Sequence, residues 1–174
     1  MIAQLAIVAA IAALACGGRS PELASHDIAT VFFISKSDDH NRVDYGIHLD
    51  DNCVPTEDAV FPYWHEFEPA ERVHPLGVLD ERAYGIDDQH SVHGRAAVGG
   101  ELEIKLKRFD RPIDIFVAKQ HGQCVAYATT RIDGHSAIFT DAFVQLGGFL
   151  SIDFVELHGR DTVAGKPLVE RVKP

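Results

Sequence analysis

The chain has 174 residues, a formal net charge of −10 and a pI near 5.3, and 46% of its residues are hydrophobic. This length fits one domain and excludes a large multidomain enzyme. The negative charge excludes a protein that binds nucleic acid through phosphate contacts, because such binding needs a basic face. The hydrophobic content is enough to bury a core, which excludes an intrinsically disordered chain.

The N-terminus has the pattern of an export signal. Residues 1–15 carry no charge and consist mostly of Ala, Ile, Leu and Val, in a run too short to span a membrane as a helix. We predict that this segment is a signal peptide, that residues 16–28 form a flexible tether, and that residues 29–174 form one β-rich domain. Cys16 follows Ala13-Leu14-Ala15, which resembles the lipobox of bacterial lipoproteins. Plain secretion, with cleavage nearby and an unmodified Cys16, is the alternative.

The cysteine content agrees with export. Once Cys16 is assigned to a lipid anchor, Cys53 and Cys124 remain, an even number that can pair in an oxidising compartment. Two separate thiols are the alternative, because spacing along the chain does not establish geometry. By resemblance to Gram-negative lipoproteins, the absence of Asp after Cys16 favours the outer membrane. We therefore predict an exported cell-envelope protein held to that membrane by its lipid.

The first half of the domain is predicted to form strands at residues 30–35, 42–49 and 60–66, with a polar turn at residues 36–41. Ile and Val number 29 against 12 Leu, which favours pleated structure. Pro62 places the start of its strand, or the whole strand, at a sheet edge, because proline cannot donate to a ladder.

Only one stretch has a helical pattern. Leu76, Leu79 and Ala83 are spaced i, i+3 and i+7, and Pro75 stands where a first helical residue is favoured. Gly77 weakens this helix, so we expect one or two turns.

The second half alternates more clearly. Residues 101–107 place Leu102, Ile104 and Leu106 on one face and charged side chains on the other. Further strands are predicted at residues 95–98, 113–117, 124–131, 136–142, 150–157 and 167–172, between Gly-containing turns. These short strands, together with one short helix, indicate an all-β fold, an antiparallel sandwich or barrel.

The sequence contains none of the common catalytic or nucleotide-binding motifs, such as G-x-S-x-G, H-E-x-x-H, C-x-x-C or a P-loop. We therefore nominate no catalytic residue and expect no cofactor. His90 and His93 are candidate metal ligands within residues 87–93, with a carboxylate as the third ligand. A solvated polar loop is the alternative interpretation of this segment, and the one we favour.

Aromatic side chains with polar ends gather in two places. Residues 61–67 include Tyr63 and Trp64, and Tyr84 lies further along the chain. Such side chains suit an apolar cleft for a sugar or another amphiphilic ligand, and we take these three as candidate ligand-binding residues. Ordinary core packing is the alternative.

Several short segments together resemble a family of bacterial exported proteins known as a domain of unknown function. The resemblance covers nearly the whole chain after Ala29. It implies a single, mostly β domain in the cell envelope and brings no catalytic residues with it. The segments are Phe33-Ile34-Ser35-Lys36-Ser37, Asn41-Arg42-Val43-Asp44-Tyr45, Tyr63-Trp64, Arg82-Ala83-Tyr84-Gly85 and Val155-Glu156-Leu157-His158-Gly159-Arg160-Asp161.

These observations favour a non-catalytic, lipid-anchored envelope protein whose β domain binds a small ligand, a glycan or a protein partner. One alternative is an envelope hydrolase with an acid or a His/metal site near His90 and His93. A purely structural envelope domain is the other. The partners expected are the membrane, through the lipid, and one of these ligands, and not nucleic acid.

Overall fold

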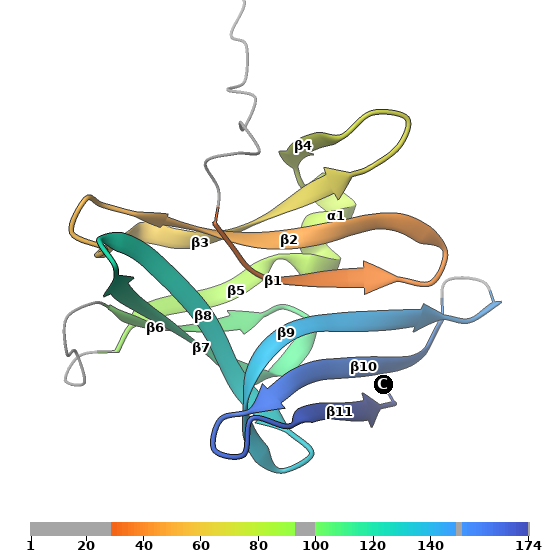
Figure 1. Ribbon diagram of the computed structural model, residues 1–174. Coiled ribbons are helices and arrows are strands. Elements are labelled where there is room, and N and C mark those ends of the chain that lie inside the picture. The colour runs from red at the N-terminus through yellow and green to blue at the C-terminus, as the bar shows by residue number, and fades with distance from the viewer. Residues whose placement is uncertain (1–28, 93–99, 149–150, 174) are drawn as a thin grey trace, which may run out of the picture.

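The computed structural model describes residues 29–92, 100–148 and 151–173, which form eleven strands and one helix (Figure 1). This confirms the predicted mostly β fold with one short helix. The predicted signal peptide, the tether and Cys16 lie outside the described residues. The strands are β1 (Ala29–Lys36), β2 (Asp39–Leu49), β3 (Pro55–Glu66), β4 (Arg72–Pro75), β5 (Ile86–Ser91), β6 (Glu101–Leu106), β7 (Phe109–Gln120), β8 (Gln123–Ile132), β9 (His135–Leu146), β10 (Ile152–Asp161) and β11 (Pro167–Val172), and the helix is α1 (Val78–Tyr84).

All strands belong to one sheet that branches at β9. Its main order is β4-β3-β2-β1-β9-β8-β7-β6-β5, while β10 pairs with the other edge of β9 and β11 pairs with β10. Along one edge of β9, residues 135–139 pair with β8 and residues 141–144 pair with β1. The β1–β9 pair is parallel, so the expectation of a wholly antiparallel sheet is wrong at this point. No crossover helix is needed there, because the intervening strands themselves connect β1 to β9.

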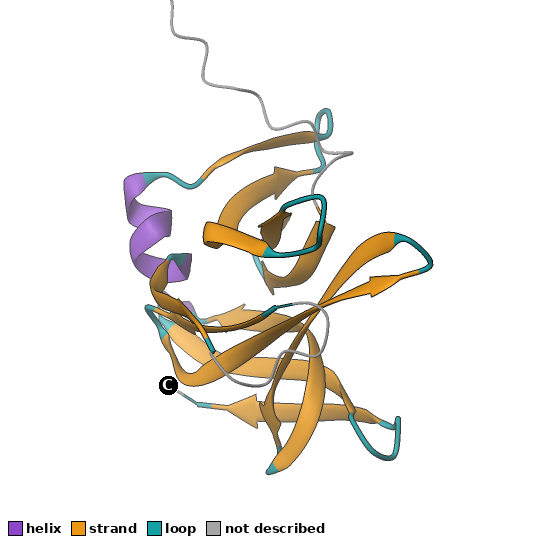
Figure 2. Cartoon of the chain, turned by 90° about the vertical axis from the view of Figure 1, so that its left-hand side faces the viewer, coloured by secondary structure: helices purple, strands orange, loops and turns teal. Residues whose placement is uncertain are grey.

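The sheet curls round on itself (Figure 2), and β3 comes into contact with β5. In the described part of the chain these two strands form no ladder, and the side chain of Gln89 spans the gap. Its Nε2 donates to Asp58 Oδ1 at 3.1 Å, and its Oε1 accepts from the backbone N–H of Val60 at 3.2 Å. The fold is therefore barrel-like but not a closed barrel.

The core fills the inside of this curl. Leu102, Ile104 and Leu106 are all buried, as their alternation predicts. Phe32 and Tyr45 stack with ring centroids 4.3 Å apart, and the Tyr45 hydroxyl donates to the carbonyl of Tyr84 at 2.5 Å. Burying one such large apolar side chain contributes about 1.5–3 kcal/mol. The buried Tyr45 hydroxyl thereby fixes the end of α1 against the core.

A disulfide joins the β2–β3 turn to the start of β8. The sulfurs of Cys53 and Cys124 are 2.04 Å apart, and the two residues are separated by 71 positions in the sequence. Cys53 is buried and has a positive φ of 64° in this turn. The bridge links two distant segments of the sheet, so it constrains a long loop of the unfolded chain.

One sequence prediction in the middle of the chain differs from the structure. Residues 87–91, which we interpreted as a polar loop, belong to β5, an antiparallel partner of β6. The pattern hides this strand because Ile86 and Gln89 alone are partly buried and a register shift follows Ile86. The predicted partner of β6 at residues 95–98 lies outside the described residues.

A short helix forms in the predicted region, but it begins at Val78, and Pro75 belongs to β4 and not to the first helical turn. The predicted apolar spacing also does not produce a buried face. The helix residues are not buried, and Leu79 is 76% exposed. Instead, Ala83 and Tyr84 at the C-terminal end of α1 contact a cavity. No helix in the described ranges is long and apolar enough to cross a membrane.

Candidate functional site

A cavity of about 730 Å³ lies between the inner face of β9, β10 and β11 and the hairpin of β6 and β7. Ala83 and Tyr84 of α1 contribute to one part of its wall. This volume is within the range of about 300–1,000 Å³ that is typical of small-molecule sites. The cavity is therefore large enough for a small organic ligand.

The strand register explains why the cavity wall is apolar. Alternate residues of β9 face inward, namely Ala142, Val144 and Leu146, and all three line the cavity. Their partners on β10 continue the same apolar rows, because Val155 lies opposite Val144 and Leu157 lies opposite Ala142. Side chains that alternate across the pleat thus make one continuous apolar surface.

An ion pair joins two of the strands around this cavity. Arg111 on β7 reaches Glu170 on β11, strands that are not neighbours in the sheet. Nη1 and Nη2 of Arg111 donate to the two carboxylate oxygens at 2.7 and 2.6 Å. The backbone N–H of Asp133 also donates to Glu170, at 2.6 Å. These charge-assisted bonds hold β11 against the β7 side of the curl.

The electrostatics of this pair follow from its geometry. The guanidinium of Arg111, together with the N–H of Asp133, lowers the pKa of Glu170 from its ordinary 4.5 to about 2. The hydrogen bonds to Glu170 raise the pKa of Arg111 in turn. Both groups are therefore charged near neutral pH, and Arg111 is already neutralised by its partner.

The three candidate aromatic residues do not form one cluster. Tyr84 lines the cavity, and Trp64 meets it edge-on with ring centroids 6.1 Å apart. Burial raises the pKa of Tyr84, so its hydroxyl stays protonated. Tyr63 points to the opposite face of β3, where it is 3% exposed and its hydroxyl lies 3.0 Å from Thr30 Oγ1. The structure therefore brings Trp64 and Tyr84 together and separates Tyr63 from them.

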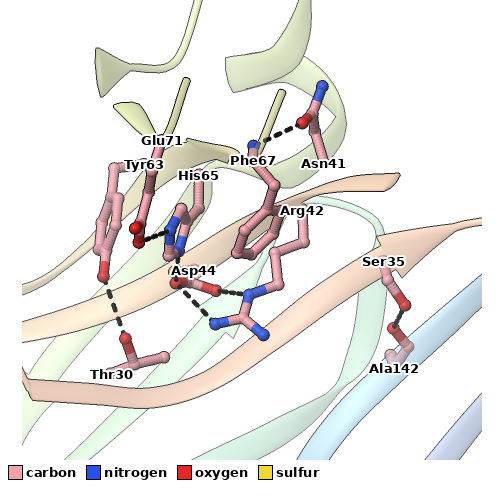
Figure 3. A network of polar contacts seen from close by, with 10 residues as sticks. All are labelled: Thr30, Ser35, Asn41, Arg42, Asp44, Tyr63, His65, Phe67, Glu71 and Ala142. Carbon is pink, nitrogen blue, oxygen red and sulfur yellow. Dashed lines mark hydrogen bonds and ion pairs between the residues drawn. The ribbon is translucent and has the colours of Figure 1, made fainter. Parts of the chain in front are cut away.

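The outer face of β1, β2 and β3 carries a charged network centred on Asp44 (Figure 3). This carboxylate is 1% exposed. Arg42 Nη2 donates to Asp44 Oδ2 at 3.2 Å, and Nε forms an ion pair with Oδ1 at 2.6 Å. His65 contacts Asp44 through Nδ1 and Glu71 through Nε2, each at 2.9 Å. A buried carboxylate needs partners of this kind, because a lone buried charge is strongly destabilising.

The same network is unsuited to nucleophilic catalysis. Both ring nitrogens of His65 are already occupied by carboxylates, so neither is available to activate a nucleophile. The hydroxyl of Ser35 points toward the carbonyl of Ala142, at 3.5 Å, and away from His65 (Figure 3). The arrangement therefore ties β2 to β3 and to the turn before β4, and it does not form a Ser-His-Asp triad.

A second Asp–His pair lies on the outer face of β9 and β10. His158 Nδ1 is 2.6 Å from Asp141 Oδ2, and Nε2 is 3.7 Å from Glu156. Phe33 on β1 is the register partner of Asp44 on one side and of Asp141 on the other. Each histidine is again placed between two carboxylates, which indicates a structural role for both.

Of the two candidate metal-binding histidines, the structure describes only His90. His90 lies on β5 with Asp88 at 3.5 Å and Glu103 at 3.9 Å, and its side chain is largely exposed. His93 lies outside the described residues. Within the described ranges, no group of three or more His, Cys, Asp or Glu side chains is placed to hold a metal ion.

Sequence reasoning missed the cavity and the Arg42–Asp44 network. The sequence does contain a signal for the network. Arg42 and Asp44 are charged residues that alternate with the core residues Val43 and Tyr45 along one strand. The cavity had a weaker signal, the alternation of Ala142, Val144 and Leu146. That alternation predicts an inward face but not that the space in front of it is unfilled.

Comparison with known proteins identifies a family. The family model described as Domain of unknown function (DUF4833) matches residues 32–171, which is most of the chain. The chain therefore belongs to this family, and the predicted resemblance to a domain of unknown function is confirmed. No curated protein and no solved structure matches the chain.

Proposed function

We propose that this member of the DUF4833 family is a non-catalytic binding module of the cell envelope, and that its ligand is a small molecule with an apolar part held in the cavity of β6, β7, β9, β10 and β11. The single observation that carries the proposal is this cavity, whose volume of about 730 Å³ is enclosed mainly by aliphatic and aromatic side chains. Apolar cavities with a few polar groups at the edge are the usual form of small-molecule sites.

A small ligand fits the structure better than a glycan held by the predicted aromatic residues. A sugar stacking on those side chains would need an open ring face. Tyr63 is almost fully buried, and Trp64 packs against the core and against Tyr84. Tyr84 instead presents part of its surface to the cavity.

The proposal also places the protein in the cell envelope, anchored by a lipid. Cys16 would carry a lipid after removal of residues 1–15, which would hold the domain at the outer membrane. The Cys53–Cys124 disulfide supports an oxidising compartment outside the cytosol, where such bonds persist. Mass spectrometry of the mature protein tests this directly. The expected result is an N-terminal Cys16 with attached acyl chains, whereas an intact Met1 would contradict export.

Binding is tested with a fluorescent apolar probe, N-phenyl-1-naphthylamine, whose emission rises when it enters an apolar cavity. Leu146→Trp places a large ring into the cavity and should abolish the increase. Phe143→Trp is the matched control, because Phe143 lies on the same strand but faces the other side of the sheet. Circular dichroism confirms that both variants fold. Equal probe binding by the two folded variants would refute the cavity as the site.

A further inference from the structure

The edge of the cavity carries positive charge in a protein whose net charge is −10. Three cationic residues line the cavity, Arg108, Arg111 and Lys173, against one acidic residue, Asp110. Arg111 is neutralised by its bidentate contact with Glu170. Asp110 lies near enough to Arg111 to favour its charged form. Asp110 therefore offsets one of the other two cations, and Arg108 and Lys173 leave this edge of the cavity with a net charge of +1.

These two cations are placed at the edge of the cavity by the ends of strands. Arg108 is in the turn between β6 and β7, and Lys173 directly follows β11. Both are exposed, and in the part of the chain that the structure describes neither forms an ion pair with an acidic side chain. The neighbouring Lys107, by contrast, is bound to Glu81 of α1 at 3.0 Å. The C-terminal end of the chain, which follows β11, and α1 lie on the same side of the molecule in Figure 2.

We infer that the ligand of the cavity is a single-chain anionic amphiphile, with its hydrocarbon chain against the β9–β10 wall and its negatively charged head beside Arg108 and Lys173. This inference rests on the proposed binding function and adds the chemical class of the ligand. The hydrocarbon chain is stabilised by the apolar rows of Val144 and Val155. The head group is selected by charge, because the net positive charge of this edge attracts an anion and repels a cation.

The inference is tested by displacement of N-phenyl-1-naphthylamine from the full-length protein at low salt. Three ligands share one chain length and differ in the head group: dodecanoate, dodecanol and dodecyltrimethylammonium, each below its critical micelle concentration. Acetate supplies the head group without the chain. We expect dodecanoate to displace the probe at about tenfold lower concentration than dodecyltrimethylammonium, and acetate not to displace it.

Charge-reversal variants locate the head group. Arg108→Glu and Lys173→Glu should each weaken dodecanoate binding about fivefold and leave dodecanol unchanged. Lys166→Glu is the matched control, since this exposed lysine lies in the turn at the other end of β11. It should leave all three affinities unchanged.

The outcomes separate the two proposals. If all three dodecyl compounds displace the probe equally, or if both reversals behave like Lys166→Glu, the anionic head group is refuted while the binding function stands. If dodecanol binds and dodecanoate does not, the inference is also refuted. If neither the probe nor any dodecyl compound binds, the proposed function itself fails.

Discussion

Replacement of Glu170 by Gln removes one charge from the contact that joins β7 to β11. The Gln side chain can still accept a hydrogen bond, but it cannot ionise. The pKa of Glu170 is lowered from 4.5 to about 2, chiefly by hydrogen bonds from Arg111. A shift of this size corresponds to at most about 3 kcal/mol. Since the side chain is 22% exposed, solvent screening reduces the expected loss to about 1–2 kcal/mol at pH 7.

The sign of the pH dependence follows from the direction of the shift. A carboxylate whose pKa is lower in the folded state stabilises the fold above its unfolded pKa, near 4.5, and loses this effect as the pH falls toward 2. Urea unfolding of the parent protein and of Glu170→Gln should therefore differ most at neutral pH. The difference should shrink steadily between pH 4.5 and pH 2.

Glu156→Gln provides the matched control. Glu156 also binds an arginine, Arg171, but on the outer face of the sheet, where that arginine is largely exposed. Exposed pairs of this kind contribute little to stability. At pH 7, Glu170→Gln should therefore lower the free energy of unfolding more than Glu156→Gln does. A Glu170→Gln protein as stable as its parent at pH 7, or a difference that does not change with pH, would refute the reasoning.

Three further substitutions test the fold at other points. Replacing Cys53 and Cys124 by Ser should cost about 4 kcal/mol, because the bridge closes a long loop, and denaturant unfolding with and without reductant measures this. Tyr45→Phe removes the donor to the Tyr84 carbonyl and should cost about 1–2 kcal/mol in the same assay, with an unchanged far-ultraviolet spectrum. Asp44→Ala leaves a partly buried arginine and histidine without their shared carboxylate and should cost about 1.5–3 kcal/mol, visible as a lower thermal midpoint. If removal of the disulfide or of the Asp44 carboxylate lowers the stability by less than about 1 kcal/mol, that group does not stabilise the fold as described.

Strands were predicted well from the sequence wherever one face of the strand is buried and the other is exposed to solvent. Leu102, Ile104 and Leu106 show this alternation, and β6 forms where they predict it. The strand at residues 86–91 was not predicted, because few of its residues are buried and a register shift interrupts their alternation. The parallel β1–β9 pair was also beyond local patterns, since it depends on how a sheet of many strands curls.

The candidate site depends still more on long-range geometry. Arg111 and Glu170 are 59 residues apart, and neither stands in a recognisable motif. Trp64 and Tyr84 were grouped by residue type, and the structure does bring them into contact. Tyr63 was grouped with them by proximity in sequence. Adjacent residues of a strand point to opposite faces, so Tyr63 and Trp64 are placed on different sides of the sheet.

The central claim is that the space inside the curled sheet holds the chain of a small ligand. Nuclear magnetic resonance of the methyl-labelled protein with dodecanoate tests this most directly. The account predicts intermolecular nuclear Overhauser effects from the hydrocarbon protons to the methyl groups of Val144, Leu146 and Val155. Contacts confined to outward-facing methyl groups such as Val169, or no contacts at saturating ligand, would contradict it.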